Sequence, residues 1–163
     1  ILMNKILIRL SIVSLLLTIL FGTACTDQKA SEVVLEKDGI EISLPYILEN
    51  ASNTAAAYLH INNTTSTSEI LVIVDSNFGT AMLHETITKD EMVQMRHLAK
   101  GIEILPKSHL YLEPGSFHVM LNNLPSKLSS GDKVELILHF KNRGQLTIDV
   151  PVIKSTEHVG HSY

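Results

Sequence analysis

Cysteine is almost absent from this chain, because Cys25 is the only one among 163 residues. The folded part downstream of Cys25 therefore has no disulfide and no thiolate ligand. A secreted domain without disulfides needs a hydrophobic core of adequate size. From Cys25 onward 139 residues remain, enough for one domain with such a core.

Aromatic residues are also scarce, at 5% of the chain, and there is no basic run. Lys5 and Arg9 are the only charged residues before Cys25, so the remainder has 11 basic and 17 acidic residues. Its net charge is about −6, and an acidic domain with few aromatics is not expected to bind nucleic acid.

The chain lacks an apolar run of the about 20 residues that a transmembrane helix needs. The run at 10–21 has 12 residues and is broken by three hydroxyl side chains. A short basic region precedes it, and the small residues Gly22-Thr23-Ala24 follow. This pattern predicts a secretory signal peptide over residues 1–24, with the natural start at Met3. An uncleaved membrane anchor is the alternative.

Cys25 directly follows these small residues, as in a bacterial lipobox, where the cysteine is lipidated and becomes the mature N-terminus. Gly22 departs from the aliphatic residue usual three positions earlier. We expect a lipidated Cys25 with a polar tether over 25–32, and cleavage that leaves a free thiol is the alternative. The protein would then lie in the periplasm of a bacterial cell envelope, bound to the membrane only through its lipid.

Beyond the tether, short apolar runs of period two alternate with turn residues, and no window has a capped helical stripe. The run at 70–74 is continuously apolar, which is typical of a strand buried on both faces or of a sandwich core. Asn142-Arg143-Gly144 predicts a hairpin turn. The sequence predicts one antiparallel all-β domain at 33–153, a sandwich or Greek-key barrel, followed by a flexible tail at 154–163. The expected strands are 40–44, 55–61, 70–74, 79–87, 92–98, 102–105, 109–112, 117–121, 134–140 and 146–150.

Methionine is confined to one central window. Apart from Met3, the methionines are Met82, Met92, Met95 and Met120. Core methionines that fill gaps would have no reason to gather in this way. The same window contains histidines, among them His84 and His118. Imidazole nitrogen with thioether sulfur suits Cu(I) and does not suit hard cations such as Mg²⁺.

Strand geometry brings these donors together in pairs. His118 and Met120 are two residues apart and would point to the same face of one strand, just after a turn at 114–116. His84 and Met95 flank an expected hairpin loop at 88–91, so their strands should be neighbours. We therefore predict a metal site of His84, Met95, His118 and Met120.

The same residues resemble a known family. Leu83-His84-Glu85-Thr86, a Met95-Arg96 pair ten residues after His84, Leu112-Glu113-Pro114-Gly115 and His118-Val119-Met120-Leu121 are similar to the periplasmic copper chaperones of the PCuAC type. Their pattern is a His, ten residues, a Met and a distant His-x-Met. This chain has 22 residues between Met95 and His118, one more than usual, and we expect the extra residue in the loop at 99–101. A bulge beside Met95 is the alternative.

The resemblance implies a cupredoxin-like β-barrel that binds Cu(I) and delivers it, as a carrier and not an enzyme. The expected partner is a copper-accepting subunit of a respiratory oxidase or another copper chaperone. A blue-copper electron carrier is excluded, since that site needs a cysteine thiolate with two histidines. The competing hypotheses are a metal-independent β-sandwich interaction or assembly module of the cell envelope, and a copper redox enzyme, for which nothing suggests a substrate pocket.

The remaining methionines and histidines are at most secondary candidates for metal binding. Met82 is a candidate secondary contact, although core packing is the favoured interpretation, and Met92 should be partly exposed with a smaller chance of touching copper. His158 and His161 in the tail could hold Cu(II) weakly. The other histidines are expected to face solvent or to be hydrogen-bonded: His60, His97, His109 and His139.

Overall fold

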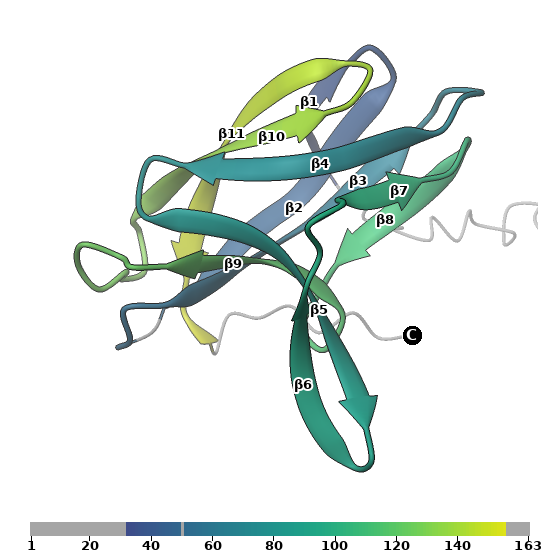
Figure 1. The fold of residues 1–163 in the computed structure, drawn as a ribbon. Helices are drawn as coiled ribbons and strands as arrows, with labels where there is room; N and C mark the ends of the chain where they lie inside the picture. Colours follow the sequence, from purple (N-terminus) through teal and green to yellow (C-terminus); the bar gives the residue numbers. More distant parts are fainter. Residues whose placement is uncertain (1–31, 50, 156–163) are drawn as a thin grey trace, which may run out of the picture. The chain divides into compact units, whose positions relative to one another are not determined.

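The computed structural model describes residues 32–49 and 51–155. The predicted signal peptide, the candidate lipidation site Cys25 and the tail histidines His158 and His161 lie outside the described residues. The described part of the chain is built from β-strands (Figure 1). Within it, no helix is long and apolar enough to cross a membrane. The strands are β1 (Val33–Lys37), β2 (Ile40–Leu48), β3 (Ala55–Asn63), β4 (Glu69–Ser76), β5 (Thr80–Lys89), β6 (Met92–His97), β7 (Ile102–Ile104), β8 (Ser108–Leu112), β9 (Phe117–Asn122), β10 (Lys133–Phe140) and β11 (Gly144–Ile153).

These strands pair in the order β6-β5-β9-β8-β3-β2-β11-β10-β4-β7, with β1 added beside β2 and a further contact between β9 and β3. The prediction of an all-β domain is confirmed. Most pairings are antiparallel, but β2 runs parallel to β11, and β8 runs parallel to β9. Period-two alternation is the same in both kinds of pair, so the sequence could not reveal these two contacts.

The core is built from the alternating strands. In β3 the residues Ala57, Leu59 and Ile61 are completely buried, and their neighbours along the strand are only partly covered. Val134, Leu136 and Leu138 of β10 repeat the pattern and join the same hydrophobic cluster. Each fully buried aliphatic side chain contributes about 1.5–3 kcal/mol relative to an exposed one. The core thus fixes which face of each strand is left for chemistry.

Two expectations for the strands need correction, and one strand was missed. β2 does not end at Pro45 but continues to Leu48, because a register shift between Ser43 and Tyr46 accommodates the proline. The apolar run in β4 is not buried on both faces, since Val72 is 40% exposed and Ile73 is 51% exposed. The strand β1 was not anticipated at all.

One buried ion pair links β4 to the turn between β10 and β11. Glu69 is completely buried, and Arg143 donates to its Oε2 from Nη1 at 2.7 Å. Its Oε1 accepts from the backbone N–H groups of Ile70 at 2.8 Å and Asn142 at 3.0 Å. Burial by itself raises the pKa of Glu69, but the hydrogen bonds from Ile70, Arg143 and Asn142 outweigh it and lower the pKa. The carboxylate therefore stays charged inside the fold.

Candidate metal centre

The pairing of β5 with β9 forms the centre of the candidate site. His84 lies directly across from His118, and Met82 lies directly across from Met120. Val119 and Leu121 are completely buried in the core. Because side chains alternate along a strand, His118 and Met120 project from the opposite face.

The hairpin of β5 and β6 supplies the remaining predicted donor. Its turn is at Asp90 and Glu91, whose φ angles are 51° and 63°, so the predicted hairpin is present. Met95 pairs with Thr86, and His97 pairs with His84 in unbroken register. No bulge therefore lies beside Met95. In Figure 1 the hairpin extends away from the other strands of the sheet.

Cross-strand pairing puts seven side chains on one face, which we call the donor face. His84 is at its centre, directly opposite both His97 and His118. Residues directly opposite have Cβ atoms about 4.5–5.5 Å apart, and diagonal neighbours are about 7–8 Å apart. Met95 and Met120 are diagonal neighbours of His84. The donor face consists of Met82, His84 and Thr86 on β5, Met95 and His97 on β6, and His118 and Met120 on β9.

The ring of His118 is held in one orientation. It is only 3% exposed, and its Nδ1 lies 3.2 Å from the carbonyl oxygen of Ser116. A carbonyl can only accept, so Nδ1 carries the proton and Nε2 keeps its lone pair. That Nε2 is buried and has no hydrogen-bond partner among the described residues. A ligand that accepts this lone pair would satisfy the nitrogen.

His84 presents a second nitrogen of the same kind. Its Nδ1 is also buried without a hydrogen-bond partner in the described part of the chain. The rings of His84 and His118 are 5.8 Å apart between centroids. Burial lowers the pKa of His84, and the neighbouring His118 and His97 lower it further. The imidazole is thus kept neutral, which is the form that binds metals.

The thioethers are the other candidate metal donors on this face. In the ranges that the structure describes, no three His, Cys, Asp or Glu side chains form a metal-binding group. Buried polar atoms without partners are costly, and two imidazole nitrogens share this state on one face. Met95 is 61% exposed, and Met120 is partly buried beside them. The arrangement fits a soft metal ion held by nitrogen and sulfur.

The structure places the two secondary candidates, Met82 and Met92, on opposite faces of the sheet. Core packing is the wrong interpretation for Met82, which is 38% exposed and belongs to the donor face. Met92 is exposed as expected, but it pairs with Lys89 and points to the face opposite that of Met95. The structure does not bring Met92 to the donor face.

The other histidines have varied surroundings. His60 contacts Glu113 at 2.8 Å, and His139 contacts Asp75 at 2.8 Å. His109 is exposed and stacks on Tyr111. His97 differs, because its ring lies edge-on to that of His84 at 5.4 Å. Sequence reasoning missed this placement, although the spacing Met95-x-His97 on one predicted strand was a usable signal.

Tyrosines border the donor face on the side of β3. Tyr58 is 6.5 Å from the ring of His118, and Tyr46 is 5.1 Å from Tyr58. Burial raises the pKa of Tyr46 to about 12, with Tyr58 and Glu113 adding to the shift. Burial also raises the pKa of Tyr58. Both phenols therefore stay neutral at physiological pH and add no negative charge beside the imidazoles.

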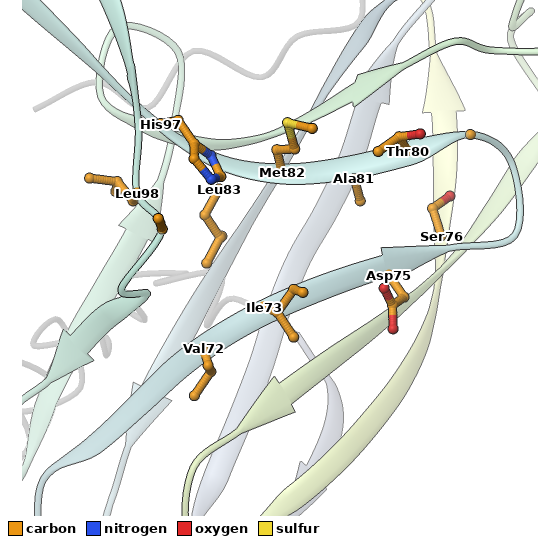
Figure 2. A pocket seen from close by; sticks show the side chains of 12 residues that line it. Val72, Ile73, Asp75, Ser76, Thr80, Ala81, Met82, Leu83, His97 and Leu98 are labelled. Carbon is orange, nitrogen blue, oxygen red and sulfur yellow. The ribbon is translucent and has the colours of Figure 1, made fainter.

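A pocket of about 500 Å³ opens next to the donor face, between β4 and β5 (Figure 2). Its lining includes Ile73, Leu83, Met82 and His97. Met82 and His97 thus border both the donor face and this pocket. The figure shows Met82 on one side of β5 and Leu83 on the other.

This chain is similar to known proteins in sequence and in fold. Residues 40–152 match the family described as "Putative lipoprotein LpqE-like". The chain belongs to the LpqE-like family. A curated relative in this comparison, "Putative lipoprotein Lxx21020" of Leifsonia xyli subsp. xyli (strain CTCB07), is 32% identical over 118 residues, which cover 72% of this chain and 71% of the relative.

Solved structures show the same fold for this LpqE-like protein. The apo PCuAC domain from PmoF1 aligns with a TM-score of 0.62 at 24% identity, covering 74% of this chain and 98% of that domain. The copper-bound PCuAC domain from PmoF2 gives 0.60 at 23% identity, covering 74% and 97%. The Cu(I) form of DR1885 from Deinococcus radiodurans gives 0.55 at 22% identity, covering 81% and 87%. The predicted PCuAC-type, cupredoxin-like fold is confirmed.

Proposed function

We propose that this LpqE-like protein is a copper chaperone that binds Cu(I) through His84, Met95, His118 and Met120. It acts as a carrier in the bacterial cell envelope and not as an enzyme. The observation that supports this most directly is the pair of buried, unpartnered nitrogens, His84 Nδ1 and His118 Nε2. Two solved relatives in fold are copper-bound proteins by their titles, which agrees with the proposal.

The donor chemistry suits a metal that must be released again. All four proposed ligands are neutral, so bound Cu(I) keeps its positive charge. Thioether sulfur has no proton to lose and cannot form a disulfide, which suits an oxidising compartment. A thiolate cage would hold Cu(I) with anionic ligands, whereas this set offers soft donors without charge. We therefore favour transport and transfer over storage.

The exposure of the donors suggests the order in which an accepting protein would replace them. His118 is buried and hydrogen-bonded to Ser116, so it forms the fixed end of the site. Met95 is 61% exposed on the edge strand β6. The ligands of an accepting protein would first replace the exposed thioether and last replace the buried imidazole.

The cellular setting that we propose is supported by the pattern of residues 1–25 and by the name of the family. We propose that Cys25 carries a lipid and that residues 25–32 tether the domain to the membrane. The lipoprotein names of the matched family and relative support an anchor of this kind. The recipient we propose is a copper centre of a respiratory oxidase, reached directly or through another copper chaperone. The tail histidines His158 and His161 would bind Cu(II) weakly.

The decisive test is the double variant His118→Ala/Met120→Leu. Cu(I) affinity is measured by competition with a chromophoric chelator, and circular dichroism checks the fold. We expect Cu(I) binding to be lost while the β spectrum is retained. The matched control is His109→Ala/Met92→Leu, which removes one exposed histidine and one exposed methionine outside the donor face.

Normal copper binding by the double variant would show that the proposed site is wrong. The metal-independent interaction module would then be favoured. That alternative predicts that association with envelope partners is unchanged by copper or by either double variant.

A further inference from the structure

We propose that His97 is an additional copper donor, through which the donor face also holds Cu(II). In that state His84, His97 and His118 supply three imidazole nitrogens. The inference rests on the proposed Cu(I) site but assigns a residue and an oxidation state beyond it. No redox step is involved, because copper in either state would be supplied from outside.

The first support is the row of three rings across neighbouring strands. His97 on β6, His84 on β5 and His118 on β9 are directly opposite one another in consecutive pairings. The ring centroids of His97 and His84 are 5.4 Å apart, and those of His84 and His118 are 5.8 Å apart. The two buried nitrogens without hydrogen-bond partners, His84 Nδ1 and His118 Nε2, belong to rings of this row.

The second support is the freedom of the third ring. His97 is exposed on β6, an edge strand of the sheet. Among the described residues, none hydrogen-bonds its ring, and only the edge contact with His84 engages it. In the ranges that the structure describes, these three rings do not form a group that could hold a metal ion. Because His97 is exposed, its side chain can change rotamer without displacing the core, and Cu(II) binding requires that its ring turn toward His84.

The chemistry of the two oxidation states separates the roles of the donors. Cu(I) is soft and accepts thioether sulfur, whereas Cu(II) follows the general preference for imidazole over thioether ligands. Met95 and His97 occupy neighbouring positions on the same face of β6. One strand thus offers sulfur for Cu(I) and nitrogen for Cu(II), while His84 and His118 remain ligands in both states.

The test compares both oxidation states in the same full-length protein. The parent carries His158→Ala and His161→Ala, so that the tail does not contribute Cu(II) ligands. The variant adds His97→Ala, and the control adds His109→Ala, which removes another exposed histidine. Cu(II) sulfate is titrated against a competing chelator and monitored by electron paramagnetic resonance. Cu(I) affinity is measured by chelator competition under anaerobic conditions.

We expect His97→Ala to weaken Cu(II) binding at least about 10-fold, because loss of a direct imidazole donor should cost no less than loss of a group that only supports a ligand. One nitrogen coupling should disappear from the spectrum, and Cu(I) affinity should match that of the parent. The His109→Ala control should leave both affinities unchanged.

An unchanged Cu(II) affinity and spectrum in His97→Ala would overturn the inference. An equal loss for Cu(I) and Cu(II) would also overturn it, since His97 would then not distinguish the oxidation states. Failure of the parent to bind Cu(I) would instead overturn the proposed function. The two failures are therefore distinguishable.

Discussion

At the scale of single residues, the candidate site depends on which imidazole nitrogen keeps its lone pair. The Ser116 carbonyl fixes the proton of His118 on Nδ1 and leaves Nε2 free to bind. His84 adds a second buried nitrogen without a hydrogen-bond partner among the described residues. The proposed site thus rests on one oriented ring and one unpartnered nitrogen beside it.

Cu(I) affinity should decrease in acid, because a protonated imidazole cannot bind. The pKa of His84 is lowered from the ordinary histidine value of 6.5 by burial and by its histidine neighbours. The neutral form of His84 therefore persists below pH 6.5 and is lost only as the pH falls through the lowered pKa. Chelator competition from pH 8 to about pH 4 checks this, because the range extends well below the ordinary pKa of about 6.5. An affinity that stays flat over the whole range would contradict histidine ligation.

Oxidation of the site methionines should abolish Cu(I) retention, since a sulfoxide replaces soft sulfur with a polar oxygen. Met95 is 61% exposed and Met120 is partly buried, so mild peroxide should modify Met95 first. Peptide mass spectrometry follows each sulfoxide while Cu(I) affinity is measured. Met92→Leu serves as the control, because Met92 is exposed but faces away from the site. Full retention of Cu(I) after complete oxidation would rule out thioether ligands.

At the scale of strands and turns, the hairpin of β5 and β6 determines where Met95 and His97 lie. Both central residues of its turn have positive φ, as a two-residue type I′ hairpin turn requires. Asp90 tolerates this region, but Glu91 at φ 63° does so at a cost.

Glu91→Gly should therefore stabilise the hairpin locally by roughly 1 kcal/mol, because glycine adopts positive φ without a steric penalty. Hydrogen exchange of the β5 and β6 amides should slow, and Cu(I) affinity should stay the same. Glu91→Ala is the control, since alanine keeps the Cβ and should not slow exchange. Faster exchange in Glu91→Gly would show that the turn geometry is misassigned.

The buried ion pair of β4 gives a test of the scaffold. Arg143→Ala leaves buried Glu69 without its ion partner and with only the hydrogen bonds from Ile70 and Asn142, which should cost about 3–5 kcal/mol of unfolding free energy. Because the pKa of Glu69 is lowered, its contribution is fully present above its ordinary pKa of 4.5 and is lost as the pH falls through the lowered pKa. Denaturant unfolding of Arg143→Ala against the neighbouring exposed Lys141→Ala measures the effect. Equal stability of both variants would contradict the assigned role.

Many of the strands and turns were predictable from the sequence. Alternation identified β3 and β10, and the turn at 142–144 and the His118-x-Met120 strand followed from local patterns. The continuation of β2 past Pro45 was missed, because a register shift leaves no mark in hydrophobic periodicity. The proximity of His97 to His84 was missed because cross-strand register is set by the exact turn at Asp90 and Glu91. The exposure of Ile73 was missed because an apolar run does not reveal which face is covered.

At the scale of the whole chain, a cupredoxin-like domain of the LpqE-like family presents a donor face on neighbouring strands. The core occupies the opposite face of β9, so the ligands can be changed with little effect on folding. His118 is the exception, since it is itself buried, and its replacement needs a check of the fold.

The central claim is that two imidazoles and two thioethers hold one Cu(I) ion. X-ray absorption at the Cu K-edge of the full-length protein, reconstituted with Cu(I), tests it directly. The account predicts a first shell containing sulfur at thioether distance together with imidazole nitrogen, and loss of the sulfur shell in a Met95→Leu/Met120→Leu variant. A first shell of nitrogen and oxygen alone in the unmodified protein would contradict it.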